Sequence, residues 1–176
     1  MMTKEELLQS VRPLVREAQI VPFDEIDFSE AVRESCRQNY CGRYATSWAC
    51  PPAVGTPSEC REKFADCTHA LFFSTVHLLE DSFDLEGMEE GKKAHTQAED
   101  EIARLCGVPR SRVLGAQSCN LCAKCTYPDS PCRFPDRCRI TVEACGISVV
   151  ELCSRTGMKY CNGENTVTYF SLIFLD

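Results

Sequence analysis

The sequence predicts an α+β fold, in which helices pack on a mixed sheet of four or five strands. Two apolar stretches, residues 69–77 and residues 166–175, have the β-branched and aromatic composition of strands buried inside a sheet. Between them, residues 88–106 carry apolar side chains at three- and four-residue spacing, which is typical of an amphipathic helix. A chain of 176 residues is long enough to bury a hydrophobic core, so we expect one domain over residues 1–176.

The N-terminal residues predict a helix followed by an edge strand. Residues 3–18 are expected to form the helix, because Thr3 and Glu6 make a capping-box pair ahead of an apolar stripe. Pro13 should kink or split it, since proline cannot donate the helical hydrogen bond. Residues 19–28 follow as a short strand, and the proline among them favours a place at the edge of the sheet.

Two shorter helices and a short strand are predicted next. Ser29 is expected to cap a helix over residues 31–35, because a serine side chain can accept a hydrogen bond from a free helical amide. Pro57 suits the first turn of a second helix that ends near residue 66. After the long helix, residues 112–116 are predicted to form a short strand that leads into a cysteine-rich segment.

The C-terminal part predicts a last helix and a hairpin. Residues 140–155 are expected to be helical, since Cys145 and Cys153 then lie on one face, where reduced cysteine packs as a small apolar residue. Residues 158–162 are expected to pair with the strand at 166–175 through an Asn-Gly turn.

The charge balance and the apolar runs exclude two classes of function. The net charge is −7, whereas binding to a phosphate backbone requires clustered Lys and Arg, so we expect no nucleic-acid partner. No apolar run reaches the length of a membrane span, so we expect no membrane insertion. The N-terminus is charged and lacks the apolar core of a signal peptide, which predicts a cytoplasmic protein.

The 14 cysteines are best explained by metal or cluster binding. A cytoplasmic environment keeps thiols reduced, which argues against a disulfide framework. A chain of this length also does not need disulfides to be stable. Soft sulfur ligands are instead what iron–sulfur clusters and zinc require.

Cys119, Cys122 and Cys125 repeat at every third position, and Cys132 follows seven residues later, next to Pro131. A thiolate at every third residue suits a loop wrapped around a [4Fe-4S] cube, in which each iron takes one sulfur ligand. The fourth ligand usually comes from farther along the chain. These four cysteines are therefore predicted to bind a first [4Fe-4S] cluster.

Zinc binding and unligated thiols are the alternatives for this segment. Structural zinc sites usually combine two C-x₂-C pairs separated by a spacer, and three thiolates at triplet spacing make a tetrahedral site with the fourth difficult. Disulfides or buried free thiols are the remaining alternative.

A second site is predicted at Cys36, Cys41 and Cys50, which lie in a segment rich in glycine, proline and aromatic residues. This composition is typical of an irregular loop. Cys60 and Cys67 lie two helical turns apart on the helix that follows, so only one of them can reach that loop. We expect Cys60 to be the fourth ligand of a second [4Fe-4S] cluster, because it is closer in sequence. A structural loop with buried thiols is the alternative.

Several motifs resemble a known family. They are Cys41-Gly42-Arg43-Tyr44, Trp48-Ala49-Cys50-Pro51-Pro52, and the segment from Cys119 through Thr126-Tyr127-Pro128-Asp129-Ser130 to Cys132-Arg133-Phe134-Pro135. The chain from about Val32 onward resembles the DUF2284 family, which comprises small predicted metal-binding proteins of anaerobic bacteria and archaea. The resemblance implies metal binding in an anaerobic cytoplasm, but it implies no particular reaction.

The chain departs from the family pattern at two positions. Ala45 follows Tyr44 where glycine is usual, and Cys145 stands where tyrosine is usual. The second departure argues that Cys145 is not an essential ligand. The sequence leaves open whether Cys67, Cys138 or Cys145 replaces one of the predicted ligands.

Three functions fit these predictions. The first is an electron carrier with two [4Fe-4S] clusters, whose acidic surface would favour a basic redox partner protein. The second is an iron–sulfur enzyme in which Cys36, Cys41 and Cys50 leave one iron open to bind substrate as a Lewis acid. The third is a structural zinc-binding module. The sequence indicates neither a substrate nor an oligomeric state.

Overall fold

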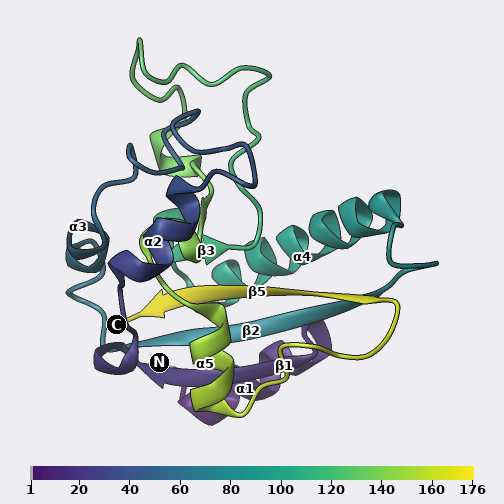
Figure 1. The fold of residues 1–176 in the computed structure, drawn as a ribbon. Coiled ribbons are helices and arrows are strands. Elements are labelled where there is room, and N and C mark those ends of the chain that lie inside the picture. Colours follow the sequence, from purple (N-terminus) through teal and green to yellow (C-terminus); the bar gives the residue numbers. More distant parts are fainter. Residues whose placement is uncertain (1) are drawn as a thin grey trace.

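The structure is a computed structural model that describes residues 2–176, and its centre is a five-stranded sheet in the order β1-β2-β5-β3-β4 (Figure 1). The strands are β1 (Glu17–Pro22), β2 (His69–Leu78), β3 (Val113–Gly115), β4 (Ile140–Thr141) and β5 (Thr166–Leu175). Neighbouring strands are antiparallel except β3 and β4, which are parallel. The sheet is mixed, so the predicted α+β class is confirmed.

Helices cover both faces of this sheet. The α-helices of the described chain are α1 (Lys4–Val11), α2 (Glu30–Arg37), α3 (Pro57–Glu62), α4 (Leu85–Cys106) and α5 (Val149–Thr156). In the view of Figure 1, α5 lies in front of the sheet and α4 behind it.

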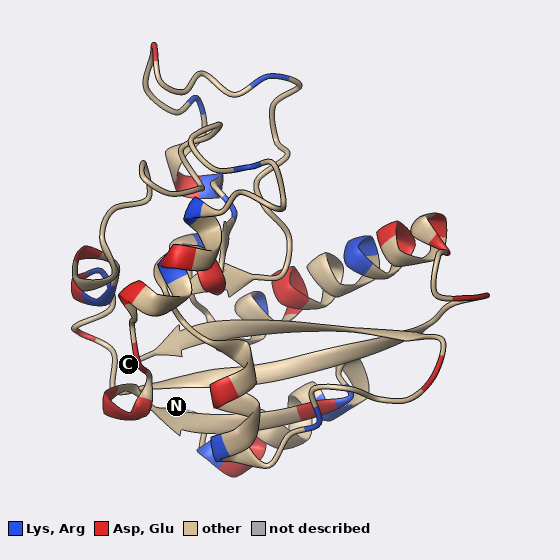
Figure 2. Cartoon of the chain, in the orientation of Figure 1, with Lys and Arg blue, Asp and Glu red and all other residues tan. Residues whose placement is uncertain are grey.

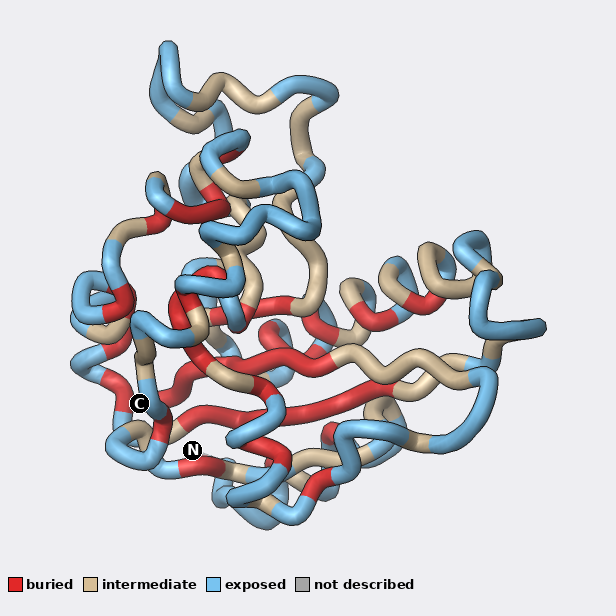
Figure 3. Tube along the Cα trace, viewed as in Figure 1, coloured by how far each residue is buried: buried red, intermediate tan, exposed pale blue. Residues whose placement is uncertain are grey.

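The central strands β2 and β5 are largely apolar because both of their faces are buried (Figure 3). Successive strand residues point to opposite faces. On β2, Leu71 and Phe73 pack with residues of α1 and α4, whereas Ala70 and Phe72 pack with residues of α3 and α5. Each face of the sheet therefore has its own hydrophobic core.

The structure confirms the predicted capping box, the predicted effect of Pro13 and the predicted edge strand near the N-terminus. The Thr3 hydroxyl accepts a hydrogen bond from the Glu6 amide in a complete capping box. Pro13 lies in the 3-10 turn Arg12–Leu14, where α1 ends. Strand β1 pairs only with β2, which confirms its edge position, although it spans fewer residues than predicted.

The helices α2 and α4 each begin directly after a residue whose side chain caps the helix. Ser29 accepts from the Ala31 amide and begins α2, as predicted. The long helix α4 begins at Leu85, earlier than predicted, because Asp84 caps it by accepting from the Gly87 amide.

The predicted helix over residues 140–155 is wrong. Residues 140–141 form β4, a 3-10 turn follows at Glu143–Cys145, and α5 begins only after Ser148, whose hydroxyl accepts from the Glu151 amide. Gly146 causes this break, because its φ of +82° lies in the left-handed region. Cys145 is therefore not part of α5, although it is buried in the same core as the helix.

The predicted C-terminal hairpin is also wrong. Residues 157–165 form a loop, and β5 pairs along its whole length with β2, from His69 opposite Leu175 to Leu78 opposite Thr166. A ten-residue apolar strand needs a partner of equal length that is buried on both faces. Only β2 provides one in the described chain, so this distant pairing replaces the local hairpin.

Gly146→Ala should lower the free energy of unfolding by about 3 kcal/mol, because alanine is strained at this φ and its Cβ would lie 2.7 Å from the Ser29 carbonyl oxygen. Gly157→Ala is the matched control, since its φ is also positive (+75°) but nothing lies within 4 Å of a Cβ there. It should cost only about 1 kcal/mol of backbone strain. Denaturant unfolding measures both, and equal losses would show that the close approach to Ser29 is unimportant.

Candidate metal centre

Two cysteine-rich loops lie side by side at one end of the molecule, at the top of the view in Figure 1. The proline loop, residues 38–56, joins α2 to α3, and the triplet loop, residues 116–139, joins β3 to β4. Apart from a 3-10 turn at Pro135–Arg137, neither contains a helix or strand, and most of their residues are exposed or half-buried (Figure 3). Their positions are therefore fixed by side-chain contacts and by their anchored ends.

Trp48 joins the two loops. Its indole N–H donates a hydrogen bond to the Ser130 carbonyl oxygen at 3.0 Å. Its ring packs edge-on against Tyr127, with the ring centroids 5.1 Å apart. Because Trp48 lies two residues before Cys50, this contact holds the proline loop against the triplet loop.

Five cysteine side chains of the triplet loop line one cavity: Cys119, Cys122, Cys125, Cys132 and Cys138. Ser47, Trp48 and Ala49 of the proline loop close it from the other side. The cavity measures about 30 Å³, so it is a narrow space between the two loops. The structure thus brings together the four cysteines predicted for the first cluster and adds a fifth.

Hydrogen bonds within the triplet loop turn Cys132 back toward the three earlier cysteines. The Ser130 amide donates to the Thr126 carbonyl oxygen at 3.0 Å, and the Thr126 hydroxyl donates to the Pro131 carbonyl oxygen at 2.9 Å. Arg133 donates to the Lys124 carbonyl oxygen at 2.9 Å and also lines the cavity. The long gap between the third and fourth cysteines is therefore a closed turn.

Cys138 is a site residue that the sequence did not assign to a cluster. Its thiol lines the same cavity as the thiols of Cys119 and Cys132. Burial and the negative charges of those two sulfur atoms raise the pKa of Cys138 to about 12, so its thiol is protonated at neutral pH. The only sequence signal is its position after the Phe134-Pro135 turn, since its spacing matches no common ligand motif.

Cys36 lies in the last turn of α2, and the charges of Cys41 and Cys50 in the proline loop act on it. Burial raises the pKa of Cys36, the Arg33 guanidinium opposes this, and the charges of Cys41 and Cys50 contribute to the rise. Cys41 is exposed and Cys50 is buried. Arg33 itself is buried and donates to the Gly55 carbonyl oxygen at 2.7 Å, which ties α2 to the far end of this loop.

Cys60 is fully buried in the core on the α5 side of the sheet, with its sulfur 3.6 Å from the Val54 carbonyl oxygen. A hydrogen bond from the Cys145 thiol lowers the pKa of Cys60 to about 7, and Lys63 contributes to the same effect. Cys145 is therefore a direct neighbour of Cys60, and the assignment of Cys60 as the fourth ligand of the second cluster stays a prediction.

Cys67, the other residue considered as a substitute ligand, is engaged elsewhere. Its sulfur accepts a hydrogen bond from Arg112, which also forms an ion pair with Asp66 at 2.6 Å. Among the side chains that the structure describes, no three His, Cys, Asp or Glu residues converge closely enough to hold a single metal ion. The donor set of the triplet loop fits a cluster of several irons, because each iron needs only one of its sulfur atoms.

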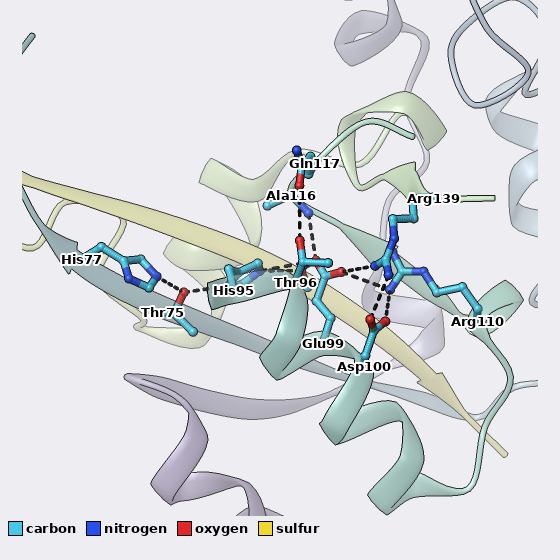
Figure 4. A network of polar contacts seen from close by, with 11 residues as sticks. Thr75, His77, His95, Thr96, Glu99, Asp100, Arg110, Ala116, Gln117 and Arg139 are labelled. Carbon is cyan, nitrogen blue, oxygen red and sulfur yellow. Dashed lines mark hydrogen bonds and ion pairs between the residues drawn. The ribbon is translucent and has the colours of Figure 1, made fainter. Parts of the chain in front are cut away.

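A buried carboxylate, that of Glu99 on α4, anchors both ends of the triplet loop (Figure 4). It accepts from the Ala116 amide at 3.2 Å, where the loop begins, and lies 3.6 Å from the guanidinium of Arg139, where the loop ends. Arg110 donates a hydrogen bond at 3.0 Å to Oε2 of Glu99, the oxygen that Arg139 also approaches. Gly115 makes room for it, since a Cβ there would lie 2.5 Å from a Glu99 oxygen.

A chain of hydrogen bonds leads from Glu99 through Ser171 and His95 to His77 on β2 (Figure 4). The Ser171 hydroxyl donates to the carboxylate and contacts His95 Nε2, both at 2.7 Å. The other ring nitrogen of His95 contacts the Thr75 hydroxyl, which in turn contacts His77 at 2.8 Å. Because the carboxylate can only accept, Ser171 donates its hydrogen to Glu99, and Nε2 of His95 carries a proton that it donates to the Ser171 oxygen.

Charged side chains are unevenly distributed over the molecule. Figure 2 shows acidic residues along α4 and in the turn before it, whereas the two cysteine loops carry few charges, of both signs. None of the helices within residues 2–176 is both long and apolar enough to cross a bilayer.

A cysteine-rich α+β protein with five thiols on one cavity has the features of a metal-binding protein. The family comparison agrees: the DUF2284 model, described as a predicted metal-binding protein, matches residues 19–175. The chain therefore belongs to the DUF2284 family. No similar protein was found among the curated proteins, and no similar fold was found among the solved structures.

His95 should make the protein sensitive to acid. Burial lowers the pKa of His95 from 6.5 to about 3, with His77 and Arg110 contributing. The unfolded chain therefore binds a proton between pH 6.5 and pH 3 that the folded chain excludes, and stability is lost as pH falls through this range. The expected loss between pH 7 and pH 5 is about 2 kcal/mol, measured by denaturant unfolding under reducing conditions.

The matched variants are His95→Gln and His69→Gln. His95→Gln should be less stable than wild type at pH 7, but its stability should change little down to pH 5. His69→Gln should keep most of the wild-type slope, because His69 is only partly buried. Equal slopes for wild type and His95→Gln would show that His95 does not cause the acid sensitivity.

Proposed function

We propose that this protein binds iron–sulfur clusters and transfers electrons to a partner redox enzyme. The observation that carries the proposal is the convergence of Cys119, Cys122, Cys125 and Cys132 on one cavity, in a loop without regular structure. A [4Fe-4S] cluster bound there would supply reversible one-electron chemistry. All 14 cysteines lie within the described residues and are free thiols, as a reducing cytoplasm requires.

The surroundings of the cavity suit electron exchange with another protein. The four ligand cysteines are half-buried, and the loop that carries them lies at the edge of the molecule (Figure 3). Trp48 shields the cavity on the side of the proline loop, while Phe134 is partly exposed on its rim. A partner that docks on this rim would approach the cluster closely. We place this redox partner and the protein itself in the cytoplasm.

A second candidate function follows from the position of Cys60. Cys60 contacts Cys145, so the second site would consist of Cys36 at the end of α2 and of Cys41 and Cys50 in the proline loop if Cys60 does not turn toward them. A cluster held there by three cysteines would leave one coordination position open for a small molecule. The protein would then be an iron–sulfur enzyme in addition to, or in place of, an electron carrier.

Protein purified without oxygen should contain iron and acid-labile sulfide, and the triple variant with Cys119, Cys122 and Cys125 replaced by alanine should lose about four iron atoms per chain, the content of one cluster, because only Cys132 and Cys138 then remain on the cavity. Cys161→Ala is the matched control, because Cys161 is exposed in the loop before β5 and should leave the iron content unchanged. Iron, sulfide and zinc analysis with EPR spectroscopy makes the measurement. Stoichiometric zinc without sulfide would contradict the proposal and identify a structural zinc module.

Cys60→Ser should keep the wild-type iron and sulfide content while lowering the free energy of unfolding by about 1–3 kcal/mol, because it places a hydroxyl in an apolar core. If the enzyme candidate is right, added cyanide or thiol should change an EPR signal in wild type and in Cys60→Ser alike. Loss of one cluster in Cys60→Ser would show that Cys60 is a ligand after all. An EPR spectrum that no small molecule alters would favour the electron carrier.

A further inference from the structure

The cavity of the triplet loop presents five thiols, one more than a [4Fe-4S] cluster has irons. We propose, on the basis of the proposed function, that Cys138 is an alternative ligand that replaces Cys132 at the fourth iron. In this exchange the bond from iron to the Cys132 sulfur breaks as a bond to the Cys138 sulfur forms. The proton of the Cys138 thiol moves to the Cys132 sulfur, so no oxidant or reductant is needed.

The position of the Cys138 sulfur makes this exchange possible. It lines the same cavity as Cys132, the residue that it replaces, and as Cys119, Cys122 and Cys125. A cluster bound in this cavity would therefore lie within reach of either side chain, and the displaced Cys132 sulfur would take up the proton that Cys138 releases.

The backbone supports of the two cysteines differ. Cys132 lies between Pro131 and Arg133 in the exposed part of the loop. Cys138 follows the 3-10 turn Pro135–Arg137 and comes two residues before β4, which pairs with β3. The intervening Arg139 is held by Asp100 at 2.8 Å. The backbone around Cys138 is thus more firmly anchored than the backbone around Cys132, so Cys138 would be able to bind the fourth iron when Cys132 does not.

Among the cysteines of the described chain, Cys138 alone joins the four predicted ligands in lining this cavity. Cys60 and Cys145 contact each other in the core, and Cys67 is bound by Arg112. Cys106 packs against the opposite hydrophobic core, on the α4 side of the sheet. It is half-buried, as Cys132 and Cys138 are, and therefore serves as the control residue.

The test uses the full-length chain, purified and reconstituted without oxygen, as wild type, Cys132→Ala, Cys138→Ala, the double variant and Cys106→Ala. Iron and sulfide content and the EPR spectrum are measured, and circular dichroism confirms that each variant is folded. The two single variants and the control should match wild type. The double variant should lose about one iron per chain and show the signal of a three-iron cluster, because only three ligands remain.

Three results would overturn the proposal. If Cys132→Ala alone loses iron to the level of the double variant, Cys138 does not bind iron. If Cys138→Ala alone loses the cluster, Cys138 is an obligatory ligand and no exchange takes place. If the double variant keeps all its iron, neither residue is the fourth ligand. If wild-type protein itself contains no iron and no sulfide, the proposed function is rejected. The iron and sulfide content of wild type therefore separates this outcome from the three results above, which concern the variants.

Discussion

The buried carboxylate of Glu99 is the contact on which the geometry of the candidate site depends. It receives hydrogen bonds from β5 through Ser171 and from the start of the triplet loop through Ala116. Arg110 and Arg139 neutralise its charge, which would otherwise be costly in a position that is only 1% exposed. One side chain of α4 therefore holds the sheet and both ends of the triplet loop together.

The middle of each loop is organised differently from its ends. The proline loop is fixed at its far end by Arg33, and the triplet loop by Glu99, but the cysteines between these anchors lie in irregular segments. An irregular loop can direct several thiolates to one point, which a strand cannot do because its side chains alternate between two faces. The scaffold thus limits where the loops can be, while the bound metal would determine how their centres are arranged.

Local signals in the sequence predict much of the fold. The capping residues Thr3, Ser29 and Thr56 all begin helices, and the apolar stretches that contain Phe72 and Phe174 are the central strands. The two wrong predictions have different causes. The pairing of β5 with β2 joins residues far apart in the chain, which no local pattern reports. The predicted helix over residues 140–155 is interrupted because Gly146 adopts a left-handed φ within an otherwise helical pattern.

In the candidate site, too, sequence spacing predicts some residues, whereas others are brought to the site only by the folded chain. Triplet spacing is a local signal, and the structure places Cys119, Cys122, Cys125 and Cys132 together. Nearness to Cys50 in sequence favours Cys60 as a ligand, but the turn before α3 directs its side chain into the core, where it meets Cys145. The spacing of Cys138 matches no motif, yet the 3-10 turn before it returns the chain to the cavity. His95 gives no signal, because a histidine on an amphipathic helix is equally compatible with either face.

The two hydrophobic cores have consequences for how metal binding and folding are related. Both cores consist of residues from the sheet and the packed helices, and none of the five thiols of the triplet loop belongs to either. The apolar burial that stabilises the sheet is therefore complete before any metal is bound. In small zinc domains, by contrast, the metal supplies the folding energy itself. In this chain the metal would stabilise the two loops rather than the sheet, so the scaffold holds the ends of the loops in place while the metal would arrange their centres.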